Sequence, residues 1–232
     1  SSTFKSLITS IPQNRRLRVL EVGAGRGGTS QHLLPLCDQN NTDYIYTDIS
    51  AGFFDQASRD FTDYSFVQYQ SLNLEESPSE QGFSDLQYDV VIAANVLHAT
   101  CDMRQTLAHI SRLMVPGGYL ILLEGTERSI FADLTFGLLD GWWRFNDDVR
   151  EDYPLLSQSK WNSVLQDQGF SQTVFVNGSA KNNSVSQSVI VSQLSPEFKL
   201  KEHVPTSVKR RWLVVGRDQQ FLGMMGSHLD QI

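Results

Sequence analysis

The chain has few of the features that mark secreted, metal-binding or membrane proteins. Among its 232 residues are only two cysteines, which form neither a metal-ligand spacing nor a disulfide framework. No apolar run approaches the length of a membrane span, and no leader pattern opens the sequence. The five histidines are scattered, so no cluster predicts a metal site. We therefore expect a cytoplasmic protein that binds neither a metal nor a membrane.

Positive charge is also in short supply. The 19 lysines and arginines are outnumbered by 26 aspartates and glutamates, and the formal net charge is −7. This balance argues against non-specific attraction to nucleic acid. The apolar share of 40% and the charged share of 19% are ordinary for a globular protein, and the length suffices for one large α/β domain.

What the sequence does have is an apolar strand that runs into a glycine-rich turn, at residues 19–28. Gly23, Gly25 and Gly27 permit a tight turn and the close approach of a ligand where a Cβ would clash. Glu21 discriminates between ligands, because a carboxylate repels a pyrophosphate but attracts the ammonium and sulfonium groups of S-adenosylmethionine. The sequence therefore predicts this cofactor. The predicted contacts from the turn are Glu21, Gly23, Ala24, Gly25 and Gly27.

A dinucleotide site is an alternative interpretation of the same turn. Gly23, Gly25 and Gly28 also satisfy the G-x-G-x-x-G pattern, and Asp48 lies twenty residues after Gly28, as a nicotinamide dinucleotide site requires. A structural turn without a ligand is a third interpretation.

Strand and helix patterns alternate over the first 170 residues, which predicts a mostly parallel sheet with helices on both faces. The expected strands are Leu17–Val22, Tyr44–Thr47, Phe66–Tyr69, Tyr88–Ala94 and Gly118–Glu124. The expected helices are Thr29–Leu36, Ala51–Asp60, Asp102–Met114 and Ser157–Gln168. Val174–Val176 and Ser188–Val191 then flank a polar stretch, which predicts an antiparallel hairpin. Such a hairpin is unusual for dinucleotide folds and typical of the seven-stranded, Rossmann-like class I methyltransferase sheet.

Further cofactor contacts are expected where the next strands end. Asp48 follows the second strand, where its carboxylate can accept hydrogen bonds from ribose hydroxyls or cap the helix that begins near Ala51. Asn73 and Leu74 follow the third strand and are placed to meet adenine through an amide and an apolar contact, although asparagine in a loop is commonly turn chemistry. The remaining predicted cofactor contacts are Ile49 and Asn95.

A second pattern combines an imidazole with a carboxylate. A buried strand delivers His98 to the carboxyl edge of the sheet, where open α/β folds bind ligands, and Glu124 ends the neighbouring strand. A carboxylate beside an imidazole fixes its tautomer and favours the protonated form that proton abstraction creates. We predict a catalytic His98–Glu124 pair, with a structural hydrogen bond as the alternative.

The run from Leu17 to Phe170 resembles the C-methyltransferase domains of modular type I polyketide synthases. The motifs that carry the resemblance are Leu20–Thr29, Tyr46–Ser50, Gln81–Phe83, Ala94–Thr100 and Phe136–Trp143. The Asn-Val-Leu-His-Ala-Thr and Gly-Trp-Trp segments are far more specific than the glycine turn. The resemblance implies that His98 acts as general base and that Glu124 is its partner.

The resemblance also implies a reaction and its partners. A methyl group would pass from S-adenosylmethionine to the α-carbon of a β-ketoacyl thioester on an acyl carrier protein, beside neighbouring synthase domains. Trp142 and Trp143 then suit a substrate-facing wall, with packing of a helix onto the sheet as the alternative. The competing functions are an O-methyltransferase acting on a β-hydroxyl or enol oxygen, an NAD(P)-binding oxidoreductase domain, and a non-catalytic structural domain.

We expect a methyltransferase core over residues 1–193. Residues 194–232 are then a linker and either the start of a following domain or an extra edge strand, since Trp212–Gly216 is similar to the first strand of a ketoreductase-type unit. Domains of this family usually carry a sizeable N-terminal lid, and only about sixteen residues precede the first expected strand. We therefore expect a core whose closure over substrate is impaired.

Overall fold

The computed structural model describes residues 2–11, 15–177 and 187–200. The chain divides into two units, residues 1–199 and 200–232, and the first contains nearly all of the described residues. The expected strand Trp212–Gly216 and most of the expected hairpin loop lie outside the described residues. The domain boundary after residue 193 therefore stays a prediction.

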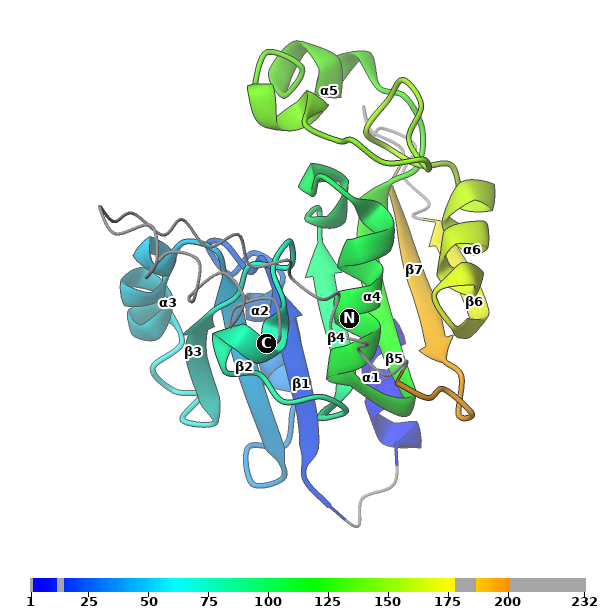
Figure 1. Ribbon diagram of the computed structural model, residues 1–232. Coiled ribbons are helices and arrows are strands. Elements are labelled where there is room, and N and C mark those ends of the chain that lie inside the picture. The colour runs from blue at the N-terminus through cyan, green and yellow to red at the C-terminus, as the bar shows by residue number, and fades with distance from the viewer. Residues whose placement is uncertain (1, 12–14, 178–186, 201–232) are drawn as a thin grey trace, which may run out of the picture. The chain divides into compact units, whose positions relative to one another are not determined.

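A seven-stranded sheet forms the centre of the first unit, in the order β3-β2-β1-β4-β5-β7-β6 (Figure 1). Strands β1 to β5 pair in parallel, whereas β7 pairs antiparallel with both β5 and β6. The strands are β1 Leu17–Val22, β2 Thr42–Asp48, β3 Val67–Ser71, β4 Tyr88–Ala94, β5 Met114–Gly125, β6 Phe170–Asn177 and β7 Gln187–Leu194. The mostly parallel sheet with its antiparallel hairpin is confirmed.

Helices cover both faces of this sheet, as predicted (Figure 1). The α-helices are α1 Ser2–Ser10, α2 Ser30–Leu33, α3 Phe54–Asp60, α4 Met103–Leu113, α5 Ile130–Thr135 and α6 Gln158–Asp167. The short 3₁₀ helices are η1 Leu34–Leu36, η2 Ala51–Phe53, η3 Pro78–Gln81, η4 Leu97–Ala99 and η5 Asp140–Trp143.

Two hydrophobic clusters fill the two sides of the sheet. One joins α4 and α6 to the sheet, and the other joins α1, α2 and α3 to it. Strand β1 contributes to both, because successive side chains of a strand point to opposite faces: Leu20 belongs to the first cluster and Val19 to the second. The sheet is thus buried on both faces at its centre, which explains the continuous apolar runs in β1 and β4.

Helix α4 shows how a local pattern specifies an element. Met103, Leu107 and Ile110 recur at helical spacing, and each is fully buried. The side chain of Asp102 caps the helix, since its Oδ1 accepts a hydrogen bond from the Gln105 backbone N–H at 3.0 Å. The apolar face and the cap are confirmed, whereas Met114, expected at the helix end, begins β5 and is buried in the same cluster.

Two other helices differ from the predicted segments. The expected helix Thr29–Leu36 is divided into α2 and η1, and Pro35 occupies the first turn of η1. Proline has no N–H to donate to the preceding turn, so a continuous α-helix is interrupted there. The expected helix Ala51–Asp60 likewise begins as the 3₁₀ helix η2 before it continues as α3. Helices α1 and α5 were not predicted.

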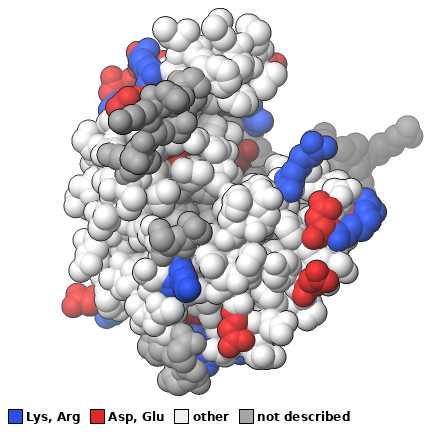
Figure 2. All heavy atoms as spheres, turned by 180° about the vertical axis from the view of Figure 1, so that it is seen from behind, with Lys and Arg blue, Asp and Glu red and all other residues white. Residues whose placement is uncertain are grey.

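Residues 126–157, which we call the α5–η5 segment, lie above the carboxyl edge of the sheet (Figure 1). Ala132, Trp142 and Tyr153 form a small hydrophobic cluster within it. Figure 2 shows uncharged residues at the very top of the molecule, beside a group of charged residues at the upper left. The segment's exposed large apolar side chains are Ile130, Phe131, Leu134, Phe136, Leu138, Leu139 and Trp143. In the described ranges, no helix is both long and apolar enough to cross a membrane.

Candidate active site

The glycine turn after β1 is closely packed on one side and open on the other. Gly23, Gly25 and Gly27 all have positive φ angles, of 60°, 57° and 76°, which glycine adopts readily. A Cβ on Gly23 would lie 2.5 Å from Cγ2 of Val96, and one on Gly27 would lie 2.5 Å from Cε2 of Phe61. A Cβ on Gly25 would meet only the carbonyl oxygen of Gly23, at 4.0 Å. The turn therefore leaves open space for a ligand beside Gly25.

Glu21 lies beneath this turn and does not project out of it. Its side chain is 2% exposed, and Oε2 accepts hydrogen bonds from Ser30 Oγ at 2.6 Å and from the Tyr44 hydroxyl at 2.7 Å. Burial raises the pKa of Glu21 to about 7, although both hydrogen bonds favour the ionised form. The predicted contact with a cationic amine therefore stays a prediction, and a cation bound nearby would lower this pKa.

Asp48, at the end of β2, holds the turn in place. Its Oδ2 accepts a hydrogen bond from the Gly25 N–H at 2.9 Å, and its Oδ1 accepts one from the Ser50 N–H at 2.9 Å. The Ala24 N–H donates to the Thr47 carbonyl at 2.9 Å, which is a second hydrogen bond between the turn and β2. Each Asp48 oxygen keeps a further lone pair, so the predicted ribose contact remains compatible with this arrangement.

Ile49, the residue after Asp48, is 68% exposed. A large apolar side chain with so little protein around it is available to a planar ligand at the end of β2. Its predicted contact with the cofactor stays a prediction.

The side chain of Gln81, the first residue of the Gln81–Phe83 motif, fixes the turn after β3. Gln81 accepts from the Asn73 N–H at 2.8 Å through Oε1 and donates to the Asn73 carbonyl at 2.8 Å through Nε2. The Asn73 side-chain oxygen accepts from the Glu75 N–H at 3.0 Å, as turn chemistry predicts. Leu74 is 4% exposed and belongs to the core cluster with α4. Its side chain packs in the core, and the predicted apolar contact with adenine stays a prediction.

His98 and Glu124 lie side by side at the carboxyl edge of the sheet. Strands β4 and β5 are parallel neighbours with Ala94 opposite Leu123, so the residues that follow emerge at the same edge. His98 Nδ1 lies 2.7 Å from Glu124 Oε2. Glu124 is fully buried, whereas the His98 side chain is 14% exposed. The predicted proximity is therefore an observed contact, and its catalytic role stays a prediction.

The remaining bonds of Glu124 favour the Nδ1–H tautomer of a neutral His98. Oε1 accepts from the Val96 N–H at 3.0 Å and from the Leu97 N–H at 2.9 Å, an arrangement that suits an ionised carboxylate. An ionised carboxylate can only accept, so the imidazole donates through Nδ1–H and its Nε2 carries a lone pair. Nε2 has no hydrogen-bond partner among the described residues. The site thus presents one basic nitrogen, oriented by a buried carboxylate.

Asn95 reverses the chain between β4 and η4. Its φ of 56° is unusual for a residue other than glycine, although asparagine tolerates this region better than most. The Asn95 side-chain oxygen accepts a hydrogen bond from Gln187 Nε2 at 2.8 Å, which joins it to β7. Its exposed position at the strand end is compatible with the predicted cofactor contact, which stays a prediction.

The two predicted substrate residues differ in their surroundings. The Trp142 ring lies 5.4 Å from the His98 ring, centroid to centroid, with an angle of 65° between the planes. Trp142 is 7% exposed, and its buried Nε1–H has no partner among the described residues. Trp143 is 47% exposed and donates from Nε1 to the Gly137 carbonyl at 2.9 Å. The structure therefore brings Trp142 to His98 and leaves Trp143 at the outer surface of the α5–η5 segment.

A buried ion pair near His98 was missed by the sequence analysis. Arg150 and Asp147 have side chains that are 0% and 1% exposed, and Arg150 Nη2 lies 2.5 Å from Asp147 Oδ2. Charged residues in an irregular segment ordinarily lie at the surface, so their spacing carried no signal of burial.

Comparison with known proteins shows the family of this domain. Residues 20–120 match the methyltransferase domain family. The chain contains a methyltransferase domain. The highly reducing polyketide synthase verA of Penicillium polonicum is 42% identical over 204 residues, which cover 81% of this chain and 8% of that synthase.

Solved structures agree with this family. The CurJ carbon methyltransferase matches with a TM-score of 0.76 and 48% identity, over 81% of this chain and 51% of that one. The trans-methyltransferase CalH, solved in complex with SAH, matches with a TM-score of 0.74 and 33% identity, over 83% of this chain and 55% of that one. The predicted Rossmann-like class I fold, the resemblance to the C-methyltransferase domains of polyketide synthases, and an S-adenosylmethionine-dependent methyltransferase are confirmed. The chain spans about half the length of these solved chains and under a tenth of verA.

Proposed function

We propose that this methyltransferase domain transfers a methyl group from S-adenosylmethionine to the α-carbon of a β-ketoacyl thioester carried by an acyl carrier protein. The observation that carries the proposal is the contact of His98 Nδ1 with Glu124 Oε2, at 2.7 Å, beside a glycine turn with room for a ligand. A β-ketoacyl α-carbon is acidic enough for an imidazole to deprotonate, whereas an isolated alkyl carbon is not. The pair therefore suits chemistry that begins with removal of a proton from carbon.

The residues present fit the proposed cofactor. Gly25 leaves the turn open on one side, and the Asp48 carboxylate and the exposed Ile49 lie where the nucleoside would be held. The backbone of the turn, from Gly23 through Ala24 to Gly27, would border the same ligand, with Asn73 and Asn95 at the neighbouring strand ends. When bound, S-adenosylmethionine supplies an electrophilic methyl group on a sulfonium.

His98 carries the proton transfer in this proposal. Its Nε2 lone pair forms a bond to the α-proton, the carbon–hydrogen bond breaks, and the electron pair passes to the enolate of the β-ketoacyl group. The imidazolium that results donates from Nδ1 to Glu124, whose negative charge stabilises it. General base catalysis of this kind contributes on the order of 10²–10⁴ in rate. The proton then leaves His98 to solvent, which restores the base.

Glu124 and Trp142 prepare the base for this step. The Val96 and Leu97 N–H groups hold Oε1, so Oε2 stays directed at His98 and keeps Nε2 free for substrate. The Trp142 ring packs against the imidazole at an angle of 65° between the planes and leaves less of its surface to water. Exclusion of water strengthens the charge interaction between Glu124 and the imidazolium.

Product analysis tests the proposal directly. The chain is incubated with S-adenosylmethionine and a β-ketoacyl carrier-protein thioester, and the acyl group is then released, weighed and fragmented to locate an added methyl. We expect a methyl on the α-carbon. A methoxy product would establish O-methylation instead, and absence of transfer despite calorimetric binding of the cofactor would contradict the proposed acceptor.

The matched variants are His98→Gln and His32→Gln. His32 is an exposed histidine on α2, so its replacement removes an imidazole without touching the Glu124 pair. We expect transfer to be lost in the first variant and retained in the second, with cofactor binding retained in both. Equal activity of the two variants would contradict the assignment of the base.

A further inference from the structure

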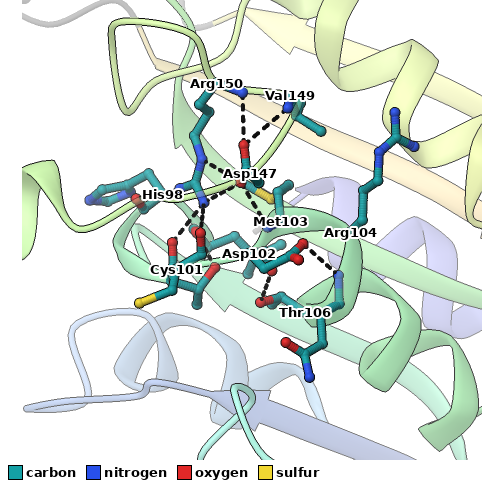
Figure 3. A network of polar contacts seen from close by, with 12 residues as sticks. His98, Cys101, Asp102, Met103, Arg104, Thr106, Asp147, Val149 and Arg150 are labelled. Atoms are coloured by element: carbon teal, nitrogen blue, oxygen red, sulfur yellow. Dashed lines mark hydrogen bonds and ion pairs between the residues drawn. The ribbon is translucent and has the colours of Figure 1, made fainter.

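Asp147 and Arg150 form a buried charge pair directly behind the loop that carries His98 (Figure 3). Arg150 donates to Asp147 Oδ2 from Nε at 2.9 Å and from Nη2 at 2.5 Å. Both side chains are almost completely shielded from solvent. Burial of two charges costs free energy unless each polar atom of the pair has a hydrogen-bond partner. The other hydrogen bonds of Asp147 and Arg150 therefore indicate the structural role of the pair.

The guanidinium binds the backbone of the His98 loop. Arg150 Nη1 donates to the His98 carbonyl at 2.9 Å, and Nη2 donates to the carbonyls of Thr100 at 2.7 Å and Cys101 at 3.1 Å. These three carbonyls follow one another closely at the end of η4 (Figure 3). A single planar side chain therefore fixes the direction of the backbone immediately after the imidazole.

The carboxylate binds the two segments on either side of the guanidinium. Asp147 Oδ2 accepts from the Met103 N–H, at the first residue of α4, at 2.9 Å. Asp147 Oδ1 accepts from the N–H groups of Val149 at 3.1 Å and of Arg150 at 2.8 Å. Burial opposes ionisation of Asp147, but the hydrogen bonds from Arg150 and Met103 outweigh it, so the pKa of Asp147 lies below the usual aspartate value. The pair is therefore ionised at neutral pH.

Glu124 and Arg150 act on opposite sides of the same short turn. Glu124 accepts from the N–H groups of Val96 and Leu97, which precede His98, and Arg150 donates to the carbonyls of His98 and the residues after it. The turn itself, η4, is only three residues long, and a single 3₁₀ turn has little stability of its own. Its shape therefore depends on these two charged side chains.

We infer that Arg150 is a positioning residue for His98, holding the backbone of the imidazole-bearing turn through its carbonyl groups while Glu124 holds it through its N–H groups. Asp147 orients the guanidinium and connects it to α4. The inference rests on the proposed function only in assigning His98 the role of base. It adds a second charged group to the site, one whose side chain is fully buried.

Arginine is required for this role because of its geometry. The guanidinium presents several N–H donors in one rigid plane, and here they reach Asp147 and three carbonyl groups together. A lysine at the same position keeps the charge but offers donors from one nitrogen atom, so it cannot satisfy all of these acceptors. Arg150→Lys therefore keeps the positive charge but loses several of the hydrogen bonds that hold the His98 loop.

The test compares Arg150→Lys and Asp147→Asn with the control Arg104→Gln. Arg104 also pairs with aspartates, Asp148 at 2.8 Å and Asp167 at 2.7 Å, but at the surface of α4 and away from His98. The first readout is ¹⁵N NMR of the His98 imidazole, identified by its absence in His98→Gln. It reports the tautomer without requiring any methyl transfer. The second readout is kcat and KM for the carrier-protein thioester, with SAH affinity measured by calorimetry.

We expect the native His98 signal to show one tautomer, protonated at Nδ1, and the Arg150→Lys signal to show exchange between tautomers. A misplaced base lowers kcat by about 10–100-fold, and SAH affinity should stay within about twofold because the glycine turn is untouched. Asp147→Asn should show the same changes, and Arg104→Gln should show none of them.

Three outcomes would overturn the inference. The first is a native His98 signal and native kcat in folded Arg150→Lys, and the second is an equal loss of kcat in Arg104→Gln. The third is failure of both Arg150→Lys and Asp147→Asn to fold, since the pair would then serve the fold as a whole. Absence of methyl transfer in the unmodified chain would refute the proposed function instead, and the NMR comparison would still decide the role of Arg150.

Discussion

Gly23 and Val96 meet where strands β1 and β4 end, so closely that a Cβ on Gly23 would lie 2.5 Å from Cγ2 of Val96. Gly23 begins the glycine turn, and the Val96 N–H is bound by Glu124 at 3.0 Å. The glycine turn and the loop that Glu124 binds through its N–H groups are therefore in direct contact. This contact explains why a glycine is needed at position 23 for two separate reasons, its positive φ and the space that Val96 occupies.

Gly23→Ala should lower both stability and cofactor binding. The left-handed backbone and the clash with Val96 together cost about 2–4 kcal/mol. Gly28→Ala is the matched control, because a Cβ there meets nothing within 4 Å. Urea unfolding of the two variants measures the difference, and equal midpoints would contradict the packing argument.

Glu124→Gln should disable His98 as a base while the side chain at position 124 keeps its backbone hydrogen bonds. Glutamine can still accept from the Val96 and Leu97 N–H groups, but an amide nitrogen facing His98 Nδ1 donates to it and so shifts the imidazole proton to Nε2. We expect kcat to fall by about 10²–10⁴-fold, with cofactor affinity unchanged. Stopped assays with mass detection measure the rate, and a kcat near the native value would show that the pair is only structural.

A comparison of Trp142→Phe with Trp161→Phe distinguishes the role of a residue in the site from that of a residue in the core. Both tryptophans bury an Nε1–H that has no partner among the described residues, but it is Trp142 whose ring packs against that of His98. Trp161 lies in the core cluster with α4. We expect Trp142→Phe to lower kcat/KM by about 5–30-fold, equivalent to about 1–2 kcal/mol.

Trp161→Phe should instead lower the free energy of unfolding and leave kcat/KM of the folded protein unchanged. Thermal melts and initial rates, taken on the same preparations, measure both quantities. A larger fall in kcat/KM for Trp161→Phe than for Trp142→Phe would contradict the placement of Trp142 in the site.

Glu21 gives the stability of the fold a defined pH dependence. Burial raises its pKa from 4.5 to about 7 in the folded state, so between these values the folded chain keeps a proton that the unfolded chain has released. Its contribution to stability is therefore largest below pH 4.5 and falls as the pH rises toward 7. The shift corresponds to about 3 kcal/mol at most.

Glu21→Gln should remove this part of the pH dependence. Glutamine keeps an oxygen that can accept from Ser30 and Tyr44 but does not titrate, so the variant should gain stability relative to the native chain as the pH is raised from 5 to 8. Urea unfolding at both pH values measures the gain, with Glu151→Gln as the control because the Glu151 side chain is 81% exposed. Parallel pH curves for the native chain and Glu21→Gln would contradict the raised pKa.

Local patterns were sufficient to predict much of the fold. Strands β1 and β4 have the predicted bounds, and α4 has the predicted apolar face and cap. These elements depend on interactions between residues a few positions apart, which a single sequence displays directly. The pairing of His98 with Glu124 was also predictable, because parallel neighbouring strands deliver their last residues to one edge of the sheet.

Other features of the site depend on contacts between distant segments. The inward direction of Leu74, the enclosure of Glu21 by Ser30 and Tyr44, and the burial of Arg150 beneath the His98 carbonyl have no local signature. Each depends on which surfaces meet when the elements pack.

The sequence by itself therefore determined which chemical groups reach the carboxyl edge of the sheet, since strand period and chain order decide where side chains emerge. Only the tertiary structure decided how those groups are held. Arg150 and His98 are separated by more than fifty residues along the chain and by 2.9 Å between Nη1 and the carbonyl oxygen. Such a contact arises from packing of the α5–η5 segment against the end of β4, and no periodic pattern in either segment encodes it.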